Sequence, residues 1–261
     1  MLESLSPSAE SSVRTGKKNV IILTSGITGS SVLAGFLVQS GYWVGESTHK
    51  KEYNTFENQD LINLNLQIFQ QAGYTANYTL ESSPDVLVKI DSIYGKVEGT
   101  PYRQFIESCN PHRPWIWKDP RLWITFRFWR HFLDLDDCKF ILLTRDLTQA
   151  WLSVILRRQI MGYKAFKKQE EHVKNSIVSV LNGSQLPYVH ITYDDLIAKP
   201  EETIQKLNAF LESDLIVDDL KAIYHKPLHR APRASVGNSM KAVLIYLKNY
   251  SERAELTMKK T

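Results

Sequence analysis

The sequence contains only two cysteines, and their spacing gives them no joint role. Cys109 and Cys138 form no CxxC pair, so they indicate neither a zinc site nor a disulfide framework. A chain with so few cysteines suits a reducing compartment, and we expect a cytoplasmic protein. The seven histidines also have no spacing typical of metal ligands, so we expect no bound metal.

Long apolar runs are also missing. No run approaches the roughly 20 residues that a membrane-spanning helix needs, and the polar N-terminus has no apolar core typical of a secretion signal. Glycine, at 12 residues, and proline, at 10, are too scarce for a collagen-like or low-complexity chain. With 43% hydrophobic and 23% charged residues, the composition is that of a folded globular protein without a membrane partner.

The chain has little excess of charge of either sign. Its 32 basic and 28 acidic residues leave a formal net charge of +4, which is too small to indicate nucleic-acid binding. The basic stretch at 157–174 is interrupted by Glu170 and Glu171, and we interpret it as a solvated helix face or a lid. A surplus this small fits a protein with one local anion site, and we expect no nucleic-acid partner. The oligomeric state is not readable from the sequence.

Short apolar runs alternate with helical patterns along the chain. Runs typical of buried parallel strands lie at 19–24, 86–90, 139–144 and 188–193, with a shorter candidate at 115–118. Helical patterns lie at 32–41, 56–73, 122–133, 147–162 and 199–213. This alternation predicts an α/β fold in which helices cover both faces of a parallel sheet. We expect one domain over 17–250, a disordered tail over 1–16 and a polar tail over 251–261.

The loop TSGITGSS at 24–31 joins the first expected strand to the first expected helix. Gly26 and Gly29 allow the backbone to curl so that successive N–H groups point inward, and Ser30 and Ser31 add hydroxyl donors. The helix directs its positive end at the same point. The loop is therefore a candidate site for a phosphate-like anion. The alternative is a plain strand-to-helix turn with a serine cap.

The loop lacks the lysine of a nucleoside triphosphatase. That motif, G-x-x-x-x-G-K-[ST], uses its lysine to reach the β- and γ-phosphates, whereas Ser30 stands at the lysine position and the glycines are closer together. We therefore expect a ligand with less charge at its 5′ end. A kinase-like phosphotransferase that uses ATP is the rival enzyme.

Charged side chains end two later strands, at the edge of a parallel sheet where ligands bind. WIWKDPRLW at 115–123 places Lys118 and Asp119 at the end of one strand. Arg145 follows the next strand, with Ser153 eight residues later on the expected helix. Local partners are the alternative for both cations. Arg145 would then pair with the neighbouring aspartate, and Lys118 would pair with Asp119 or extend to solvent.

In this order, the three segments resemble the sulfotransferases that use 3′-phosphoadenosine 5′-phosphosulfate (PAPS). The first resembles their 5′-phosphosulfate loop, and RDLTQAWLS at 145–153 resembles their 3′-phosphate motif. The resemblance implies a P-loop-like sulfotransferase fold and a 3′-phosphate held by Arg145 and Ser153. It also implies a 5′-phosphosulfate held by the loop residues Gly26, Ile27, Thr28, Gly29, Ser30 and Ser31.

Two further stretches extend the resemblance to roughly residues 19–212. GYWVG at 41–45, followed by FENQDLINLN at 56–65, resembles bacterial members, and ITYDDLIAKPEETIQKLNAFLE at 191–212 resembles the family's Y-[ED]-D-L segment and the next helix. By this resemblance Tyr193 lies near the adenine.

The resemblance also assigns catalytic residues. Lys118 falls at the position of a lysine that stabilises the transferring sulfuryl group in several members. As general base for the acceptor hydroxyl we rank Glu57 first, because related segments line the acceptor side. His49 is second for its unperturbed pKa, and Asp119 third for its place beside Lys118. The simpler alternatives are a helix N-terminal charge for Glu57 and a solvated loop residue for His49.

One residue departs from the family pattern. Members usually carry lysine or arginine in the first loop, as in R-S-G-[ST], and Ile27 stands there in this chain. Either Lys118 supplies the missing cation, or the protein is slow or a non-catalytic nucleotide-binding module. The basic segment at 229–241 is a further source of cations, namely Arg230 or Arg233.

The acceptor is left open by the sequence. Phenols, alcohols, sugars and amines all fit, and the resemblance to bacterial members favours a hydroxyl of a small natural product. Four tryptophans surround the KDPR segment, and we expect most of them in the core and one or two in an acceptor pocket: Trp115, Trp117, Trp123 and Trp129.

Overall fold

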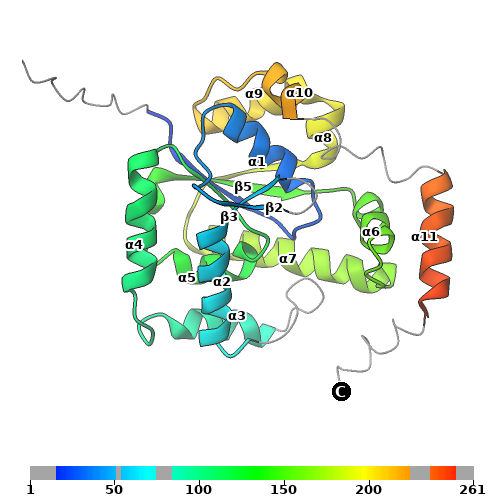
Figure 1. Ribbon diagram of the computed structural model, residues 1–261, viewed down its shortest axis with the longest axis horizontal. Coiled ribbons are helices and arrows are strands. Elements are labelled where there is room, and N and C mark those ends of the chain that lie inside the picture. Colours follow the sequence, from blue (N-terminus) through cyan, green and yellow to red (C-terminus); the bar gives the residue numbers. More distant parts are fainter. Residues whose placement is uncertain (1–15, 51–53, 75–83, 224–235, 251–261) are drawn as a thin grey trace, which may run out of the picture.

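The centre of the molecule is a four-stranded parallel sheet with the strand order β4-β1-β5-β6 (Figure 1). We describe it from a computed structural model, which places residues 16–50, 54–74, 84–223 and 236–250. The strands are β1 (Asn19–Leu23), β4 (Ile116–Lys118), β5 (Cys138–Thr144) and β6 (Tyr188–Thr192). Each coincides with an apolar run of the sequence, which confirms the prediction of an α/β fold with a parallel sheet.

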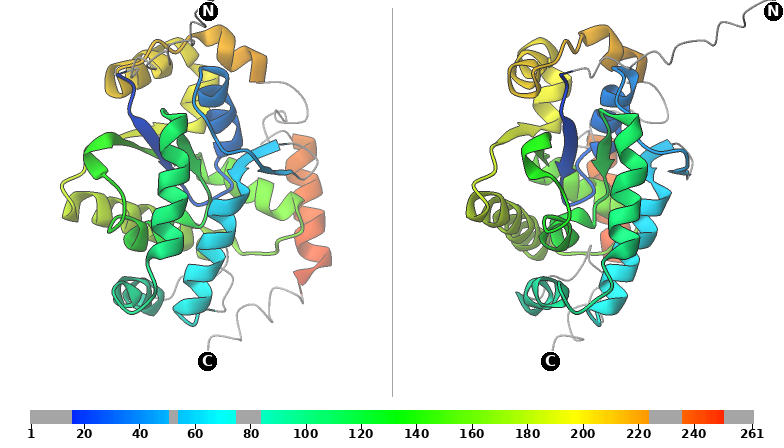
Figure 2. Two further views of the ribbon diagram at one scale, coloured as in Figure 1. Left: turned by 60° about the vertical axis from the view of Figure 1, so that its left-hand side comes forward. Right: turned by 90° about the vertical axis from the view of Figure 1, so that its left-hand side faces the viewer.

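Helices cover both faces of this sheet (Figures 1 and 2). Because successive side chains of a strand point to opposite faces, Val20 and Ile22 pack on one helical layer and Ile21 and Leu23 on the other. The first layer contains α1 (Ser30–Gln39), α8 (Tyr193–Ala198), α9 (Pro200–Leu211) and α10 (Val217–Ile223). The second contains α2 (Gln59–Gln71), α3 (Pro84–Ile93), α4 (Thr100–Cys109), α5 (Leu122–Trp129) and α7 (Tyr163–Gly183).

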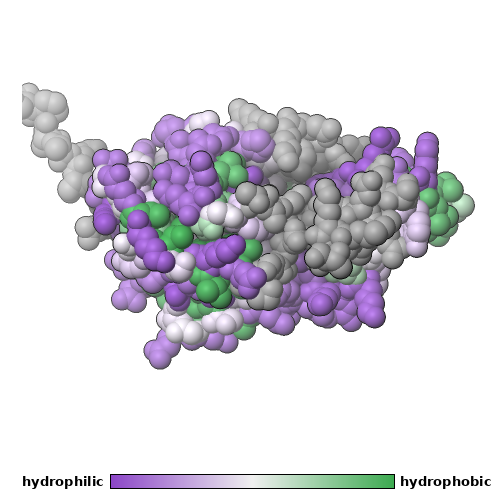
Figure 3. Space-filling view, turned by 90° about the horizontal axis from the view of Figure 1, so that it is seen from below, coloured by the Kyte–Doolittle hydropathy of each residue, from purple (hydrophilic) through white to green (hydrophobic). Residues whose placement is uncertain are grey.

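Two helices lie at the periphery of the molecule, past the carboxyl end of β5. Helix α6 (Leu147–Leu156) follows β5 directly, and α11 (Val236–Lys248) packs on it through Ala242. The opposite side of α11 is exposed and apolar, and its side chains form the green patch at the right edge of Figure 3. Those exposed side chains are Val236, Met240, Val243, Leu244 and Leu247.

The prediction of a strand at 86–90 was wrong, because this run lies inside α3. Val86, Ile90 and Ile93 are buried, whereas Val88 is 68% exposed. This three-to-four-residue period is that of a helix with one apolar face. A short run rich in valine and isoleucine does not distinguish the two structures by itself.

The predicted helix at 56–73 begins later than expected. A short antiparallel hairpin, β2 (Thr48–Lys50) and β3 (Asn54–Asn58), precedes it. The side chain of Asn58 caps α2 by accepting hydrogen bonds from the amides of Asp60 at 2.8 Å and Leu61 at 3.3 Å. Glu57 therefore lies in a strand, and its alternative interpretation as a helix N-terminal charge was wrong.

Other predicted boundaries also differ from the structure or cannot be compared with it. The helix predicted over 147–162 ends at Leu156, and Arg158 has a positive φ of 60°. The predicted tails at 1–16 and 251–261 fall outside the described residues, apart from Gly16, and the single domain over 17–250 stays a prediction.

The four tryptophans around the KDPR segment and the two cysteines are core residues. Trp115, Trp117, Trp123 and Trp129 are all at most 2% exposed, as the sequence analysis expected for most of them. Cys109 and Cys138 are free, and burial raises the pKa of their thiols to about 11 and about 12. Within the described part of the chain, no helix has the length and apolarity that a membrane crossing requires.

Candidate functional site

The site is assembled at the carboxyl edge of the sheet. The loop at 24–31, which we call the glycine loop, follows β1. Lys118 ends β4, Arg145 follows β5 and Tyr193 follows β6. The strands are in parallel register, with Ile22 beside Lys118 and Leu23 beside Leu142. Since neighbouring strands are about 4.8 Å apart, four segments that are distant in the sequence meet along one edge.

The glycine loop has the geometry of an anion cradle. Gly26 and Gly29 have positive φ values of 105° and 78°, which favour glycine. Among the described residues, no acceptor pairs with the backbone N–H groups of 26–31. The residue that caps α1 is Gly29, and no side chain caps the helix, so the alternative of a serine-capped turn was wrong. These amides and the positive end of α1 fit an anion.

Lys118 is held in a buried corner beside this loop. Its Nζ donates to Glu57 Oε1 at 2.5 Å, to the carbonyl of Thr55 at 3.1 Å and to Ser31 Oγ at 3.3 Å. The side chain is 3% exposed, and its ion-pair partner is Glu57 rather than Asp119. Both local alternatives for Lys118 were therefore wrong. The β2–β3 hairpin thus places Glu57, the first-ranked candidate for the general base, in contact with Lys118 at the end of β4.

Asp119 is enclosed and has other partners. Its carboxylate accepts from Asn65 Nδ2, from the amide of Arg121 and from Arg121 Nη1, each at 2.9 Å. Asn65 Oδ1 in turn accepts from Thr125 Oγ1 at 2.7 Å and Trp129 Nε1 at 2.8 Å. Burial raises the pKa of Asp119, and the Arg121 guanidinium opposes that rise. With both oxygens engaged and no exposed surface, Asp119 is placed to hold the KDPR turn.

His49 lies outside this network in the described structure. His49 belongs to β2 and is half-buried. Its backbone carbonyl accepts a hydrogen bond from Thr55 Oγ1 of β3 at 2.8 Å. Among the described residues no contact joins its ring to Lys118 or to the glycine loop. Arg230 and Arg233 fall outside the described residues.

Arg145 forms the second corner. Its Nη1 lies 3.5 Å from Ser153 Oγ, and its guanidinium carbon lies 5.0 Å from the centre of the Tyr193 ring. Arg145 Nε is buried and has no hydrogen-bond partner among the described residues. The alternative pairing with Asp146 was wrong, because Asp146 caps α6 by accepting from the amide of Gln149 at 2.9 Å.

Tyr193 connects this corner to the glycine loop. A Cβ on Gly29 would lie 2.2 Å from Cδ2 of the Tyr193 ring, so the ring rests directly on the glycine. The same ring also contacts the Arg145 guanidinium. The loop and Arg145 are thus separated by one aromatic ring, which is close enough for one nucleotide to contact both.

Ile27 and Ser25 attach the loop to helix α7. Ile27 packs in an apolar cluster with Val154 of α6 and Phe166 of α7. Ser25 Oγ donates to Glu170 Oε2 at 2.7 Å, and burial raises the pKa of the Glu170 carboxyl. The stretch at 157–174 is mostly helical, but it is not only a solvated face. No local sequence signal links Glu170 to a serine 145 positions earlier.

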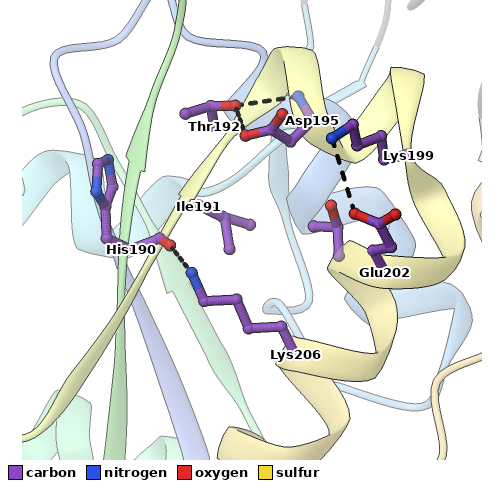
Figure 4. A pocket seen from close by; sticks show the side chains of 8 residues that line it. His190, Ile191, Thr192, Asp195, Lys199, Glu202 and Lys206 are labelled. Carbon is purple, nitrogen blue, oxygen red and sulfur yellow. Dashed lines mark hydrogen bonds and ion pairs between the residues drawn. The ribbon is translucent and has the colours of Figure 1, made fainter.

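A separate cavity of about 450 Å³ lies at the outer edge of β6, between that strand and α8–α9 (Figure 4). Its polar groups are largely paired with one another. Lys206 Nζ donates to the carbonyl of His190 at 2.7 Å, Thr192 Oγ1 donates to Asp195 at 2.6 Å, and Lys199 lies 3.9 Å from Glu202. None of the predicted site residues lines this cavity. Among the residues that the structure describes, no three histidine, cysteine or acidic side chains cluster as metal ligands would.

Comparison with known proteins gives structural neighbours only. No protein-family model matches the chain, and no curated protein matches its sequence significantly. A sulfotransferase domain of the curacin biosynthetic pathway is 14% identical, with a TM-score of 0.48 over 85% of this chain and 82% of that one. The sulfotransferase domain of a Synechococcus olefin synthase is 17% identical, with a TM-score of 0.48 over 88% and 86%.

A third neighbour is a sulfotransferase from Mycobacterium tuberculosis. It is 11% identical, with a TM-score of 0.44 over 88% of this chain and 76% of that one. All three neighbours are named sulfotransferases.

Proposed function

We propose that this protein is a sulfotransferase that moves a sulfuryl group from PAPS to a hydroxyl of a small molecule. One observation carries the proposal: the glycine loop, Lys118 and Arg145 share one edge of the sheet, and the Tyr193 ring joins the loop to Arg145. A ligand with anionic groups at two ends and an aromatic ring between them matches this layout. By the resemblance, the acceptor is a natural-product hydroxyl.

The donor is assigned to the site as follows. The free amides of 26–31 and the positive end of α1 bind the 5′-phosphosulfate. Arg145, assisted by Ser153, binds the 3′-phosphate through a charge-assisted hydrogen bond from its guanidinium. Tyr193 flanks the adenine.

The chemistry is assigned to the Lys118 corner. Glu57 accepts the proton of the acceptor hydroxyl, whose oxygen forms a bond to the sulfur while the bond from sulfur to the 5′-phosphate oxygen breaks. Lys118 Nζ stabilises the negative charge that accumulates on the departing phosphate. Because Ile27 stands where the family usually has lysine or arginine, the loop supplies no cation, and Lys118 takes that duty.

Isothermal titration with adenosine 3′,5′-bisphosphate, the product that this reaction leaves, tests the donor site. We expect binding by the wild type and a loss of about 10- to 100-fold in affinity for Arg145→Ala. Arg130→Ala is the matched control, because Arg130 pairs with Asp91 in the helical layer below the sheet. Absence of binding by the wild type, or equal losses in the two variants, would contradict the proposal.

Turnover with labelled PAPS tests the chemistry separately. Incubation with a panel of hydroxyl compounds is expected to give a labelled sulfate ester and adenosine 3′,5′-bisphosphate in equal amounts. Phosphorylation of the same compounds with labelled ATP would instead favour the rival phosphotransferase.

A further inference from the structure

The carboxylate of Glu170 is in direct contact with the start of the glycine loop, residues 24–31. Its Oε2 accepts from Ser25 Oγ at 2.7 Å, and Ser25 immediately precedes the free amides of 26–31. No lysine, arginine or histidine of the described chain lies within ion-pair distance of Glu170. The next residue, Glu171, points elsewhere and pairs with Lys167 at 3.7 Å.

The charge of Glu170 matters because the loop itself has none. Residues 24–31 contain no ionisable side chain, and the groups that face an anion there are neutral amides and hydroxyls. Lys118 reaches the far end of the loop at Ser31, but its charge is offset by Glu57. A negative group placed in this loop therefore meets one uncompensated carboxylate beside Ser25.

We propose that Glu170 is a specificity-determining residue that selects against nucleotides with a highly charged 5′ end. Its carboxylate opposes every negative charge in the loop, so the penalty grows with each further phosphoryl group. PAPS carries a singly charged sulfuryl group where ATP carries two phosphoryl groups. The inference rests on the donor site proposed above and goes beyond it by naming a residue that makes the site prefer PAPS to ATP.

The expected size of the effect follows from Coulomb's law. For an effective dielectric constant of about 20, a separation of about 8 Å and physiological salt, each added charge weakens binding by roughly 3- to 30-fold. Two added charges therefore change the preference by about tenfold or more. A change of this size is enough to make the site prefer PAPS to ATP.

The test compares Glu170→Gln with the wild type at pH 8 in a chelator. Glutamine keeps an oxygen that accepts from Ser25, so the contact survives and only the charge is lost. Isothermal titration measures the Kd of ATP and of adenosine 3′,5′-bisphosphate for both proteins. Glu171→Gln is the matched control, since it removes the same charge from the next position of the same helix, where the side chain is exposed.

We expect Glu170→Gln to lower the ratio of the ATP Kd to the bisphosphate Kd by about tenfold or more. Glu171→Gln should leave that ratio nearly unchanged. If both proteins bind the bisphosphate and the ratio is the same, the role of Glu170 is refuted while the donor site stands. If neither protein binds the bisphosphate, the proposed donor site itself is wrong, and the role of Glu170 falls with it.

Discussion

The two cations of the site, Lys118 and Arg145, differ in how many hydrogen-bond acceptors the protein provides for them. Lys118 is 3% exposed and has three acceptors within 3.3 Å, one of them the carboxylate of Glu57. Arg145 has one long hydrogen bond of 3.5 Å, an aromatic ring beneath its guanidinium and a buried Nε without a described partner. The protein therefore provides a full set of hydrogen-bond acceptors for Lys118 and few for Arg145.

This difference matches the two tasks of the proposed reaction. Stabilising a charge that exists only in the transition state requires groups that are already in place, because reorganisation at that moment costs free energy. Binding a ground-state phosphate requires donors that have no competing protein acceptor. The contrast therefore predicts that changes at Lys118 affect the rate, and that changes around Arg145 affect donor affinity.

The largest expected effect is that of Lys118→Ala on kcat. We expect a loss of about 10²- to 10³-fold, the size seen when one donor to a developing oxyanion is removed, with donor affinity nearly unchanged. Sulfuryl transfer and titration with adenosine 3′,5′-bisphosphate measure the two quantities. The variant also leaves Glu57 without its partner, so a thermal melt must show that it is folded.

Lys139→Ala is the control for Lys118. Lys139 also forms an ion pair, with Glu212 at 2.9 Å, but at the amino end of β5. An unchanged kcat is expected there. A normal kcat in Lys118→Ala would remove the difference between the corners.

Gly29→Ala tests the contact that joins the two corners. Its positive φ costs about 1–2 kcal/mol in a residue with a Cβ, and displacing the Tyr193 ring adds about 1–3 kcal/mol. Gly41→Ala is a strict control, because Gly41 has a φ of 97° but no atom within 4 Å of an added Cβ. We expect a lower Tm and weaker donor binding for Gly29→Ala, and only a small decrease in Tm for Gly41→Ala. Equal behaviour of the two variants would mean that the ring contact is unimportant.

Ser153→Ala is expected to have a smaller effect. Its hydroxyl already donates to the carbonyl of Gln149 at 2.9 Å and lies 3.5 Å from Arg145. Loss of one neutral hydrogen bond corresponds to about 2- to 10-fold in the Kd of adenosine 3′,5′-bisphosphate. Ser108→Ala removes a similar bond to a helix carbonyl at 2.7 Å and should leave the Kd unchanged. A loss as large as that of Arg145→Ala would show that Ser153 is a principal ligand.

The smallest effect concerns the pH dependence of stability at Glu170. Burial raises the pKa of this carboxyl in the folded state, so the ionised form disfavours folding. Stability should therefore increase as the pH falls through the raised folded pKa towards the ordinary value of about 4.3. Glu170→Gln should have the higher Tm at pH 8, and the difference should shrink as the pH approaches 4.5. A Tm difference that is constant with pH would show that the pKa of Glu170 is not shifted.

The sequence predicted most of the sheet because each strand is a short apolar run that is followed or preceded by a clear helical pattern. The strands at 19–24, 115–118, 139–144 and 188–193 were all confirmed. The run at 86–90 was misread because its composition suits both a strand and a helix, and only the packing of Val86 and Ile90 on one layer decides between them.

The contacts within the site were beyond the reach of sequence reasoning. The candidates Lys118, Glu57 and Arg145 were named from motifs, which did not predict their contacts. Spacing does not show that a hairpin brings Glu57 onto a lysine 61 positions later. Nor does it show that Glu170 meets the first loop.

By itself, the order of residues determined the alternation of strands and helices, the glycine loop after the first strand and the cations that end later strands. These properties follow from local apolar period, backbone freedom and position along each strand. Only the tertiary structure decided which charges neutralise one another, which donors stay unpaired and which carboxylate lies beside the loop. Electrostatic effects depend on distance and burial, and a parallel sheet brings together side chains that the chain keeps far apart.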